Sequence, residues 1–531
     1  MPPVPFRVAP RTLRRLKTLG IVLGLCALTA ATTAFIRDLT LVAELNAPAV
    51  PAHLDQNELL SLVQRGRGHS AFDKAFTQGD RLFDAAFNAL DGVGANVGQG
   101  QRFTRMPRAD LTGPGEWANH VPSRATGPNA RGCVECHNEP VTDGAGGIAG
   151  NVVRDPRHSG NVAQMIHRST PHTFGMGAVQ RLAEEMTDEL HAIRGALAAQ
   201  VRSSGAPASA PLVAKGVSFG TLTALPGKGP GSAVFDTSAV QGVSGDLIVR
   251  PLQWKGSVAF LRDFNRDAAN NELGMQAVEL VGEGVDGDGD GVVDELSVGD
   301  ITALTVYLAA QPRPVTKVEL NELGLLPEPL TQVQLDQIAH GQQVFAQIGC
   351  AVCHVPSLQL TDPVFKEPSS NANFRDARFP SGMLPRVAGV RADLPVTFDL
   401  RSDQPANVFV VNGQIVRLGA FKPTANGNGA VVELYGDLKR HDLGPDLAEA
   451  IDEVGTGASV FLTENLWGVG ATPPYMHDGR ATTLTEAILE HGGEGAASRA
   501  AFRALTTQDQ LDMLLFLDNL TLIKGGLPVG G

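Results

Sequence analysis

Apolar residues recur at helical spacing in three stretches of the chain. Residues 71–90 place them on one face and predict an amphipathic helix. Residues 334–348 show the same spacing and run directly into a Gly-Cys pair. Residues 297–310 predict a third helix, which Pro312 and Pro314 close because proline cannot continue a helix.

The segments between these helices predict little regular structure. Residues 113–129 are rich in Gly, Pro and Asn and predict a long loop. Residues 203–215 are mainly Ser, Ala, Pro and Gly and predict a linker. Residues 216–250 combine Gly with Val, Thr and Phe, which favours short strands or an irregular excursion. We expect a mainly α fold with long loops and a small irregular or β excursion.

One continuous apolar stretch lies near the N-terminus. Five basic residues at positions 7–17 precede the uncharged residues 19–35, which include small residues at 32–34 that a signal peptidase could cleave. This order is typical of a secretory signal. At about 17 residues the stretch could also serve as a single uncleaved anchor in the inner membrane. Either interpretation places the protein outside the cytoplasm, in a bacterial periplasm.

Composition excludes several classes of protein. Hydrophobic residues make up 43% and charged residues 19% of the 531 positions, which is typical of a chain with a folded core. The single apolar stretch argues against a polytopic membrane protein. The net charge of -13 argues against a nucleic-acid partner. Aromatic residues are only 5%, so a bound cofactor could fill part of the core.

The cysteines carry the strongest chemical signal. Cys26 lies in the predicted signal, and the other four form two C-x-x-C-H motifs at residues 133–137 and 350–354. In this motif the two thiols bind the vinyl groups of one haem and the histidine binds its iron. A disulfide, a redox C-x-x-C pair and a zinc site are the alternatives, and two matches in one exported chain favour two covalently bound haem c groups. The expected haem residues are Cys133, Cys136, His137, Cys350, Cys353 and His354.

The motifs suggest how the chain is divided. Residues 1–37 form the targeting segment, residues 38–325 a haem c domain with an insertion, and residues 326–531 a second haem c domain. We expect two cytochrome-c-like haem domains.

An acidic repeat at residues 286–295 resembles the start of an EF-hand calcium loop. Carboxylates occupy alternate positions and a glycine the sixth. The twelfth position is Ser297 rather than Glu, and Glu295 could substitute for it. A solvated acidic turn is the alternative interpretation. The candidate calcium ligands are Asp286, Asp288, Asp290 and Asp294.

Several short blocks together resemble the bacterial di-haem oxidoreductases, relatives of the di-haem cytochrome c peroxidases. They occur in a specific order around the two C-x-x-C-H motifs and extend over most of the chain after the targeting segment. The blocks are residues 78–83, 170–175, 271–275, 438–445, 466–470, 474–481, 483–484 and 491–494.

The resemblance implies a distal ligand for the C-terminal haem. In the peroxidase relatives it lies fourteen residues after the histidine of an H-D-G motif, which here is His477, so the implied ligand is His491. Residues 484–490 would form the helix that presents it. His354 and His491 would then be a bis-histidine pair, which lowers the reduction potential relative to a His/Met pair. Met476 and a surface role for His491 are the alternatives.

The resemblance also implies residues around the N-terminal haem. In the relatives the acid/base glutamate follows, by twenty residues, a tryptophan that relays electrons between the haems. Glu272 follows Trp254 by eighteen residues, so these two residues are the implied counterparts. Phe264 stands where the relatives carry Gln, which departs from the peroxidase pattern. His172, in a family block, is the preferred histidine of the haem pocket. The other candidates to close this haem are His158 and His167.

The function implied is reduction of hydrogen peroxide or a similar small oxidant, with electrons from a small donor cytochrome or cupredoxin. Two further functions stay open: a non-catalytic di-haem electron-transfer protein, and a di-haem oxygenase or protein-modifying oxidase. The relatives also bind calcium through backbone carbonyls near the positions of Thr472 and Pro474.

Overall fold

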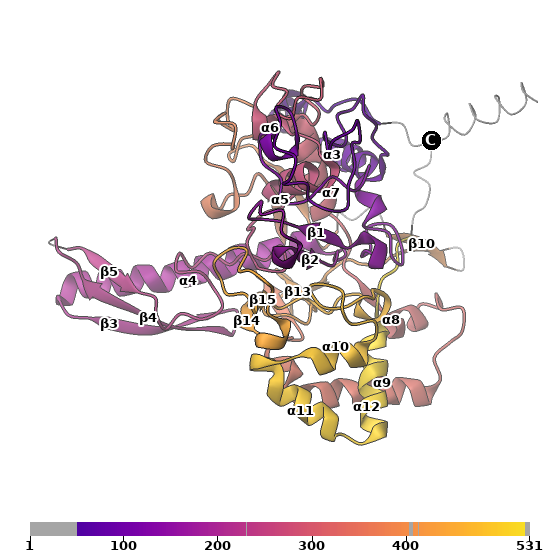
Figure 1. The fold of residues 1–531 in the computed structure, drawn as a ribbon. Coiled ribbons are helices and arrows are strands. Elements are labelled where there is room, and N and C mark those ends of the chain that lie inside the picture. The colour runs from indigo at the N-terminus through magenta and orange to yellow at the C-terminus, as the bar shows by residue number, and fades with distance from the viewer. Residues whose placement is uncertain (1–49, 230, 403–406, 412–413, 526–531) are drawn as a thin grey trace, which may run out of the picture. The chain divides into compact units, whose positions relative to one another are not determined.

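The computed structural model describes residues 50–229, 231–402, 407–411 and 414–525 (Figure 1). Contacts divide the chain into two units, Met1–Val50 and Pro51–Gly531. The predicted secretory segment, including Cys26, lies outside the described residues. Among the helices that the structure describes, none combines the length and the apolar character that crossing a bilayer requires.

The α-helices of the unit Pro51–Gly531 are mostly short, and the longest has 29 residues. A π-helical turn, Ala269–Leu273, continues directly from one of them. The α-helices are α2 (Gln56–Gln64), α3 (Gly68–Asp84), α4 (Met176–Ser204), α5 (Leu261–Ala268), α6 (Val278–Val281), α7 (Val298–Ala309), α8 (Lys317–Glu322), α9 (Gln332–Gln347), α10 (Leu484–Glu490), α11 (Ala496–Ala504) and α12 (Thr507–Asn519).

Two helix pairs pack closely at a glycine. α3 crosses α7 at Gly79, where a Cβ atom would overlap the carbonyl oxygen of Ala303. α9 crosses α12 at Gly341, where a Cβ atom would overlap the carbonyl oxygen of Asp512. In each pair the first helix precedes one of the C-x-x-C-H motifs in the sequence, so the two halves of the chain repeat one packing arrangement.

Capping boxes fix where several helices begin. Ser297 caps α7 with Asp300, Thr331 caps α9 with Gln334, and Thr483 caps α10 with Glu486. In each, the hydroxyl accepts a hydrogen bond from the third backbone N–H, and the side chain of that residue accepts one in return.

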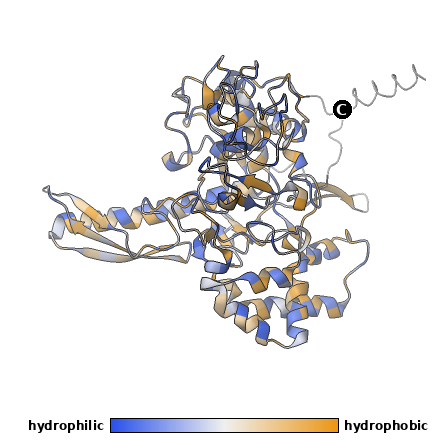
Figure 2. Cartoon of the chain, in the orientation of Figure 1, coloured by the Kyte–Doolittle hydropathy of each residue, from blue (hydrophilic) through white to orange (hydrophobic). Residues whose placement is uncertain are grey.

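The core around α9 and α12 is built from the apolar faces of amphipathic helices. Figure 2 shows hydrophobic and hydrophilic residues alternating along these helices. Phe345 contacts both Tyr435 and Phe516, with ring centroids 6.2 and 5.4 Å apart. The buried cluster consists of Val344, Phe345, Tyr435, Phe502, Met513, Phe516, Leu517 and Leu520.

The strands form small antiparallel sheets of two or three strands. In the two three-stranded sheets the central strand pairs with both others: β4 (Val217–Pro226) lies between β3 (Ala208–Ala214) and β5 (Ala233–Asp236), and β13 (Ala430–Val432) lies between β7 (Leu358–Leu360) and β12 (Lys422–Pro423). The two-stranded sheets pair β1 (Val152–Arg154) with β2 (Ile166–Arg168), β6 (Val315–Thr316) with β16 (Leu520–Thr521), β8 (Val364–Glu367) with β9 (Val396–Asp399), β10 (Val408–Val411) with β11 (Gln414–Arg417), and β14 (Arg440–Asp442) with β15 (Val460–Leu462).

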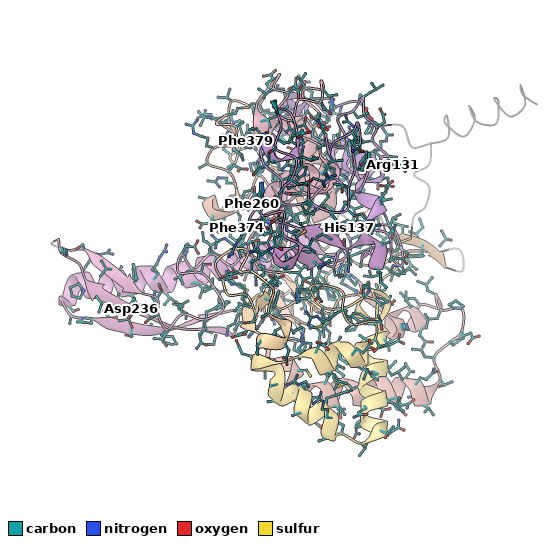
Figure 3. The ribbon with its side chains drawn as sticks, viewed as in Figure 1. Arg131, His137, Asp236, Phe260, Phe374 and Phe379 are labelled. Carbon is teal, nitrogen blue, oxygen red and sulfur yellow. The ribbon has the colours of Figure 1, made fainter. Side chains whose placement is uncertain are left out.

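The predicted strands at residues 216–250 are confirmed, but the predicted linker at 203–215 is wrong. Residues 208–214 form strand β3, which pairs with β4, and the sheet packs on α4. The register shifts between Pro211 and Val213. An edge strand tolerates proline at such an irregularity, so pairing with β4 overrides the linker-like composition. Figure 3 labels Asp236 at the end of β5.

The fold class is confirmed in part. The predicted helices at residues 71–90, 297–310, 334–348 and 484–490 are present as α3, α7, α9 and α10, although α3 ends at Asp84. The prediction of a mainly α protein is not confirmed, because 35% of residues are helical and 15% lie in strands. The predicted domain boundary near residue 325 falls between α8 and α9, and the division stays a prediction.

Candidate functional site

The first C-x-x-C-H motif is wound into one short turn. Residues Cys133–Glu135 form a 3-10 turn, and the backbone N–H groups of Cys136 and His137 both donate to the carbonyl oxygen of Cys133, at 3.1 and 3.0 Å. Both cysteines are free, and burial raises the pKa of each thiol to about 12. The turn thus brings two neutral thiols and one imidazole together.

His137 is oriented as a metal ligand would be. Its Nδ1–H donates to the carbonyl oxygen of Gly144 over 3.2 Å. Burial lowers the pKa of His137 to about 4, so the ring is neutral at pH 7. With the proton on Nδ1, the lone pair of Nε2 is available to a metal. Figure 3 labels His137.

One cavity of about 230 Å³ adjoins this motif. Its apolar wall includes Leu82, Phe83, Phe87, Leu304 and Leu308. The cavity also collects site residues that the sequence predicted from distant segments: Cys133, Cys136, His137, His172, Trp254 and Glu272.

Glu272 lies in the π-helical turn and is the acid/base candidate. Its Oε2 atom is buried and accepts no hydrogen bond, and the nearest cation is Arg154, whose Nη1 lies 4.0 Å from Oε1. Burial raises the pKa of Glu272 to about 7; the charge of Arg154 lowers it and that of Asp267 raises it. Near neutral pH the side chain can therefore both accept and release a proton.

Trp254 connects the cavity to the loop that carries the H-D-G motif. Its indole N–H donates to the carbonyl oxygen of Ser169 over 2.8 Å. Its ring meets that of His477 edge to face at 6.5 Å, and His477 stacks on Phe461 at 4.1 Å. The tryptophan is thus held between residues of both halves of the chain.

A series of buried ion pairs begins beside Glu272 and connects the two halves of the chain. Arg154 donates to Glu453 at 2.8 Å, and Arg168 pairs with both Glu453 and Glu449. Lys255 lies 3.7 Å from Glu449. These alternating charges join strands β1 and β2 to residues 449–453.

The candidate histidines of the N-terminal pocket differ in position. His172 lines the cavity, but its Nδ1 accepts from the backbone N–H of Phe174 at 3.1 Å and its Nε2–H donates to the carbonyl oxygen of Trp467 at 2.9 Å. Both ring nitrogens are therefore engaged. His158 and His167 do not line the cavity. A distal histidine from this set is not in place to close the site.

The second C-x-x-C-H motif repeats the geometry of the first. Residues Cys350–Val352 form a 3-10 turn, and the backbone N–H of His354 donates to the carbonyl oxygen of Cys350 at 3.0 Å. The Nδ1–H of His354 donates to the carbonyl oxygen of Tyr435 at 3.1 Å. Its Nε2 is again the nitrogen available to a metal.

His491 faces His354, as the resemblance implied. It follows α10, and its Nδ1–H donates to the carbonyl oxygen of Ala487, one helical turn earlier, at 2.8 Å. The two ring centroids are 6.3 Å apart. An iron bonded to both Nε2 atoms at roughly 2.0–2.1 Å, the usual length of a histidine–metal bond, separates the centroids by roughly 6.3 Å. The residues present therefore fit a bis-histidine iron here.

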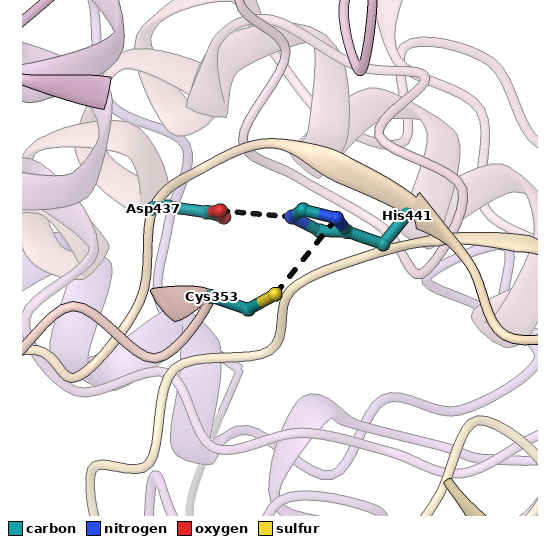
Figure 4. Close-up of side chains that lie close together, drawn as sticks. All are labelled: Cys353, Asp437 and His441. Atoms are coloured by element: carbon teal, nitrogen blue, oxygen red, sulfur yellow. Dashed lines mark hydrogen bonds and ion pairs between the residues drawn. The ribbon is translucent and has the colours of Figure 1, made fainter. Parts of the chain in front are cut away.

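A charged cluster beside the second motif was missed from the sequence. Figure 4 shows His441 between Asp437 and Cys353. The Nε2 of His441 lies 2.8 Å from Asp437, its Nδ1 lies 2.7 Å from Glu494, and Cys353 Sγ is 3.9 Å away. Burial opposes protonation, but hydrogen bonds from the ring N–H groups to Asp437 and Glu494, with Cys353 Sγ close by, raise the pKa of His441 to about 10. It is therefore an imidazolium with both N–H groups used.

Glu464 is a second cavity carboxylate that the sequence did not predict. It accepts a hydrogen bond from the side-chain amide of Asn465 at 3.1 Å, and burial raises its pKa to about 7. No sequence motif indicates this glutamate. It lines the cavity only because residues 464 and 465 fold against it.

The acidic loop is only partly assembled as the repeat predicted. Carboxylate oxygens of Asp286, Asp288 and Asp290 lie within 4.8 Å of one another. Asp294 is turned away, and its Oδ1 accepts from the backbone N–H of Gly284 at 2.7 Å. At the other expected calcium site, the carbonyl oxygen of Pro474 accepts a long bond of 3.4 Å from Ser169.

Residues 402–520 match a family model described as "Di-haem oxidoreductase, putative peroxidase". This range includes His441, Glu464, His477 and His491 and confirms the resemblance to di-haem oxidoreductases there. Two haem groups are implied by that family.

Two of the matching solved structures are a MauG-like protein associated with microbial copper homeostasis and the hydrazine synthase of Kuenenia stuttgartiensis, pressurized with xenon. The first is 15% identical, with 54% of this chain and 76% of that chain covered and a TM-score of 0.25. The second is 18% identical, with 58% and 78% covered and a TM-score of 0.22. These values are too low to assign a fold or a function to this chain. None of the curated proteins matches it.

Proposed function

We propose that this chain, whose residues 402–520 belong to the di-haem oxidoreductase family, is an exported di-haem c enzyme that reduces hydrogen peroxide or a similar small oxidant. The reaction consumes one peroxide, two electrons and two protons and yields two waters. The observation that carries the proposal is the cavity that collects the first C-x-x-C-H motif, Trp254 and Glu272.

The residues at both motifs suit covalent haem attachment. Each pair of cysteine thiols would form the two thioether bonds, and His137 and His354 would each bind an iron through Nε2. When bound, the haem groups supply redox-active iron that takes up and passes on single electrons. His491 would complete the second iron site and keep small oxidants away from it. In the first cavity His172 has no free nitrogen, which supports an iron open to substrate.

Glu272 would move the proton in the cleavage of the O–O bond. Its Oε2 has no hydrogen-bond partner, so it is free to take a proton from one peroxide oxygen and give it to the other. The raised pKa of Glu272, about 7, matches both transfers. Solvent supplies the two protons that the net reaction consumes.

Electrons would enter at the C-terminal site from a small donor cytochrome or cupredoxin and pass through Trp254. The edge-to-face contact of Trp254 with His477 and its hydrogen bond to Ser169 support this role, because they hold the ring between the two halves. Export to the periplasm, with or without retention of the N-terminal stretch as an anchor, is part of the proposal. Fractionation of cells that express the full chain tests it.

The enzyme proposal is tested with the purified holoprotein. We expect peroxide-dependent oxidation of a reduced donor cytochrome, and a high-spin ferric signal in electron paramagnetic resonance that peroxide consumes. Glu272→Gln should lower the rate by roughly 10²–10⁴-fold, the usual contribution of an acid/base group. Glu58→Gln, which removes an exposed carboxylate paired with Lys74, is the control.

Two low-spin signals that peroxide leaves unchanged would contradict the proposal and leave a di-haem electron carrier. Covalent attachment is tested separately. Cys350→Ser/Cys353→Ser should leave half of the haem bound after denaturation in acid acetone, and full retention would overturn attachment at this motif.

A further inference from the structure

The loop Asp286–Glu295 holds carboxylates in an arrangement that the proposed reaction does not use. Oxygens of Asp286, Asp288 and Asp290 converge within 4.8 Å. Asp286 accepts hydrogen bonds from the backbone N–H groups of Gly289 and Gly291, at 2.7 and 3.0 Å. Gly291, the sixth residue of the loop, has a φ of +91°, which favours glycine there.

One of these carboxylates is buried and incompletely satisfied. The side chain of Asp288 is 0% exposed. Its Oδ2 accepts from Arg124 at 2.8 Å, but its Oδ1 has no hydrogen-bond partner. A buried carboxylate oxygen without a partner is costly unless a ligand supplies one. The orphaned oxygen therefore points to a cation.

The charges around the loop also leave room for a divalent cation. Asp286, Asp288 and Asp290 supply three negative charges, whereas burial raises the pKa of the neighbouring Glu295 to about 9 and keeps this side chain neutral at pH 7. Arg124 and Arg102 pair with Asp288 and Asp290, each at 2.8 Å. Two arginines against three carboxylates leave one negative charge uncompensated, which favours a bound cation.

We propose that this loop binds one calcium ion through Asp286, Asp288 and Asp290, and that the ion rigidifies the wall carrying Glu272. All donors are hard oxygens, spaced as in the first half of an EF-hand loop, and such a flexible carboxylate set suits calcium better than magnesium, which requires near-ideal octahedral geometry. Asp294, the fourth predicted ligand, is not part of the site. The calcium site does not depend on the proposed peroxide chemistry.

The mechanical link from the loop to Glu272 runs through Arg124. Besides Asp288, its guanidinium donates to the carbonyl oxygens of Asn270 and Gly274, both at 2.8 Å. These two carbonyls flank Glu272 in the sequence. A cation that fixes Asp288 therefore fixes Arg124, which in turn fixes the π-helical turn.

The test measures metal and mobility rather than turnover. Full-length holoprotein is treated with EGTA and desalted, and calcium binding is followed by calorimetry and atomic absorption. Asp286→Asn/Asp290→Asn keeps side-chain hydrogen-bond acceptors but removes two charges. We expect it to lose one equivalent of calcium, or to bind it at least about tenfold more weakly, because affinity in such loops follows the number of charged ligands. Magnesium should not displace the calcium.

Asp236→Asn is the matched control, because this exposed aspartate also caps a turn, at Ser238, but lies on β5. It should bind calcium as the wild type does. A wild-type protein that takes up no calcium, or a double variant that binds it unchanged, overturns the site. For the link to Glu272, EGTA should speed amide hydrogen exchange at residues 269–276 in the wild type and not in the double variant; unchanged exchange in the wild type overturns that part.

Discussion

The imidazole rings of His354 and His491 face each other with their centroids 6.3 Å apart and their planes at 64°. Each ring is held by an Nδ1–H bond to a carbonyl oxygen, from Tyr435 and Ala487. Burial lowers the pKa of both residues, that of His354 to about 4. Two neutral rings with unengaged Nε2 atoms are therefore positioned for one iron between them.

Replacing one of these rings should change the potential of the C-terminal haem. We expect His491→Met to raise its midpoint by on the order of 100 mV, because a thioether favours ferrous iron and axial ligands tune haem potentials over roughly 0.8 V. A spectroelectrochemical titration measures it. His69→Met, at an exposed histidine of α3, should leave both midpoints unchanged. An unchanged midpoint in His491→Met would show that His491 is not the ligand.

Trp254→Phe should slow electron transfer between the two haems by at least about tenfold, because the indole is the aromatic group that joins the cavity to His477. Stopped-flow absorbance after reduction of the C-terminal haem follows this step. Trp117→Phe is the control: Trp117 is also a tryptophan, it is more deeply buried than Trp254, its Nε1 has no hydrogen-bond partner, and it does not line the cavity. Equal rates in both variants would exclude Trp254 as a relay.

Sequence spacing predicted the candidate haem-attachment residues, and the family resemblance implied the residues around them. Local geometry is enough for C-x-x-C-H, since all three side chains come from one turn. Glu272, Trp254 and His491 are separated widely in sequence, and only the order of family blocks indicated their roles. The structure then brings Glu272 and Trp254 into one cavity and turns His491 toward His354.

What the sequence could not predict depends on long-range pairing. His441 gains its charge partly from Glu494, 53 positions away, and no local pattern indicates that contact. Residues 208–214 were interpreted as a linker from composition, but pairing with β4 makes them a strand. The helix α4, in contrast, is predictable from its sequence, because that sequence is rich in Ala, Leu and Glu, which favour helix.

Activity should depend on the ionisation of Glu272. Burial raises the pKa of Glu272 to about 7, so the base form predominates only above that pH, and the peroxide-reduction rate should rise with pH through about 7. The charge of Arg154 lowers this pKa. We expect Arg154→Met to move the midpoint up by roughly one unit, the smaller end of the effect of an opposite charge at such distances.

A pH–rate profile from pH 5 to 9 measures the shift. Arg108→Met, at an exposed arginine paired with Asp110, should leave the midpoint in place. The raised pKa of Glu272 also implies that the free energy of unfolding falls as pH rises from about 4.5 to about 7. Over this range the carboxyl group of Glu272 has lost its proton in the unfolded chain but keeps it in the folded protein, so a rise in pH favours unfolding. If the midpoint of the pH–rate profile were the same in Arg154→Met as in the wild type, the ionisation could not be assigned to Glu272.

The glycine crossing of α9 and α12 should be sensitive to a single methyl group. A Cβ at Gly341 would overlap the carbonyl oxygen of Asp512, so Gly341→Ala must push α9 and α12 apart. α9 directly precedes the second C-x-x-C-H motif, and α12 packs against α9. Overpacking of this kind costs about 1–3 kcal/mol, and the midpoint of thermal unfolding should fall.

Gly195→Ala is the matched substitution. Gly195 also lies inside a helix, α4, but nothing lies within 4 Å of a Cβ placed there. Alanine at that position should stabilise the protein by up to about 1 kcal/mol, because it favours helix more than glycine does. The two variants should therefore move the unfolding midpoint in opposite directions, and a fall in both would point to a general cost of the extra methyl group rather than to the crossing.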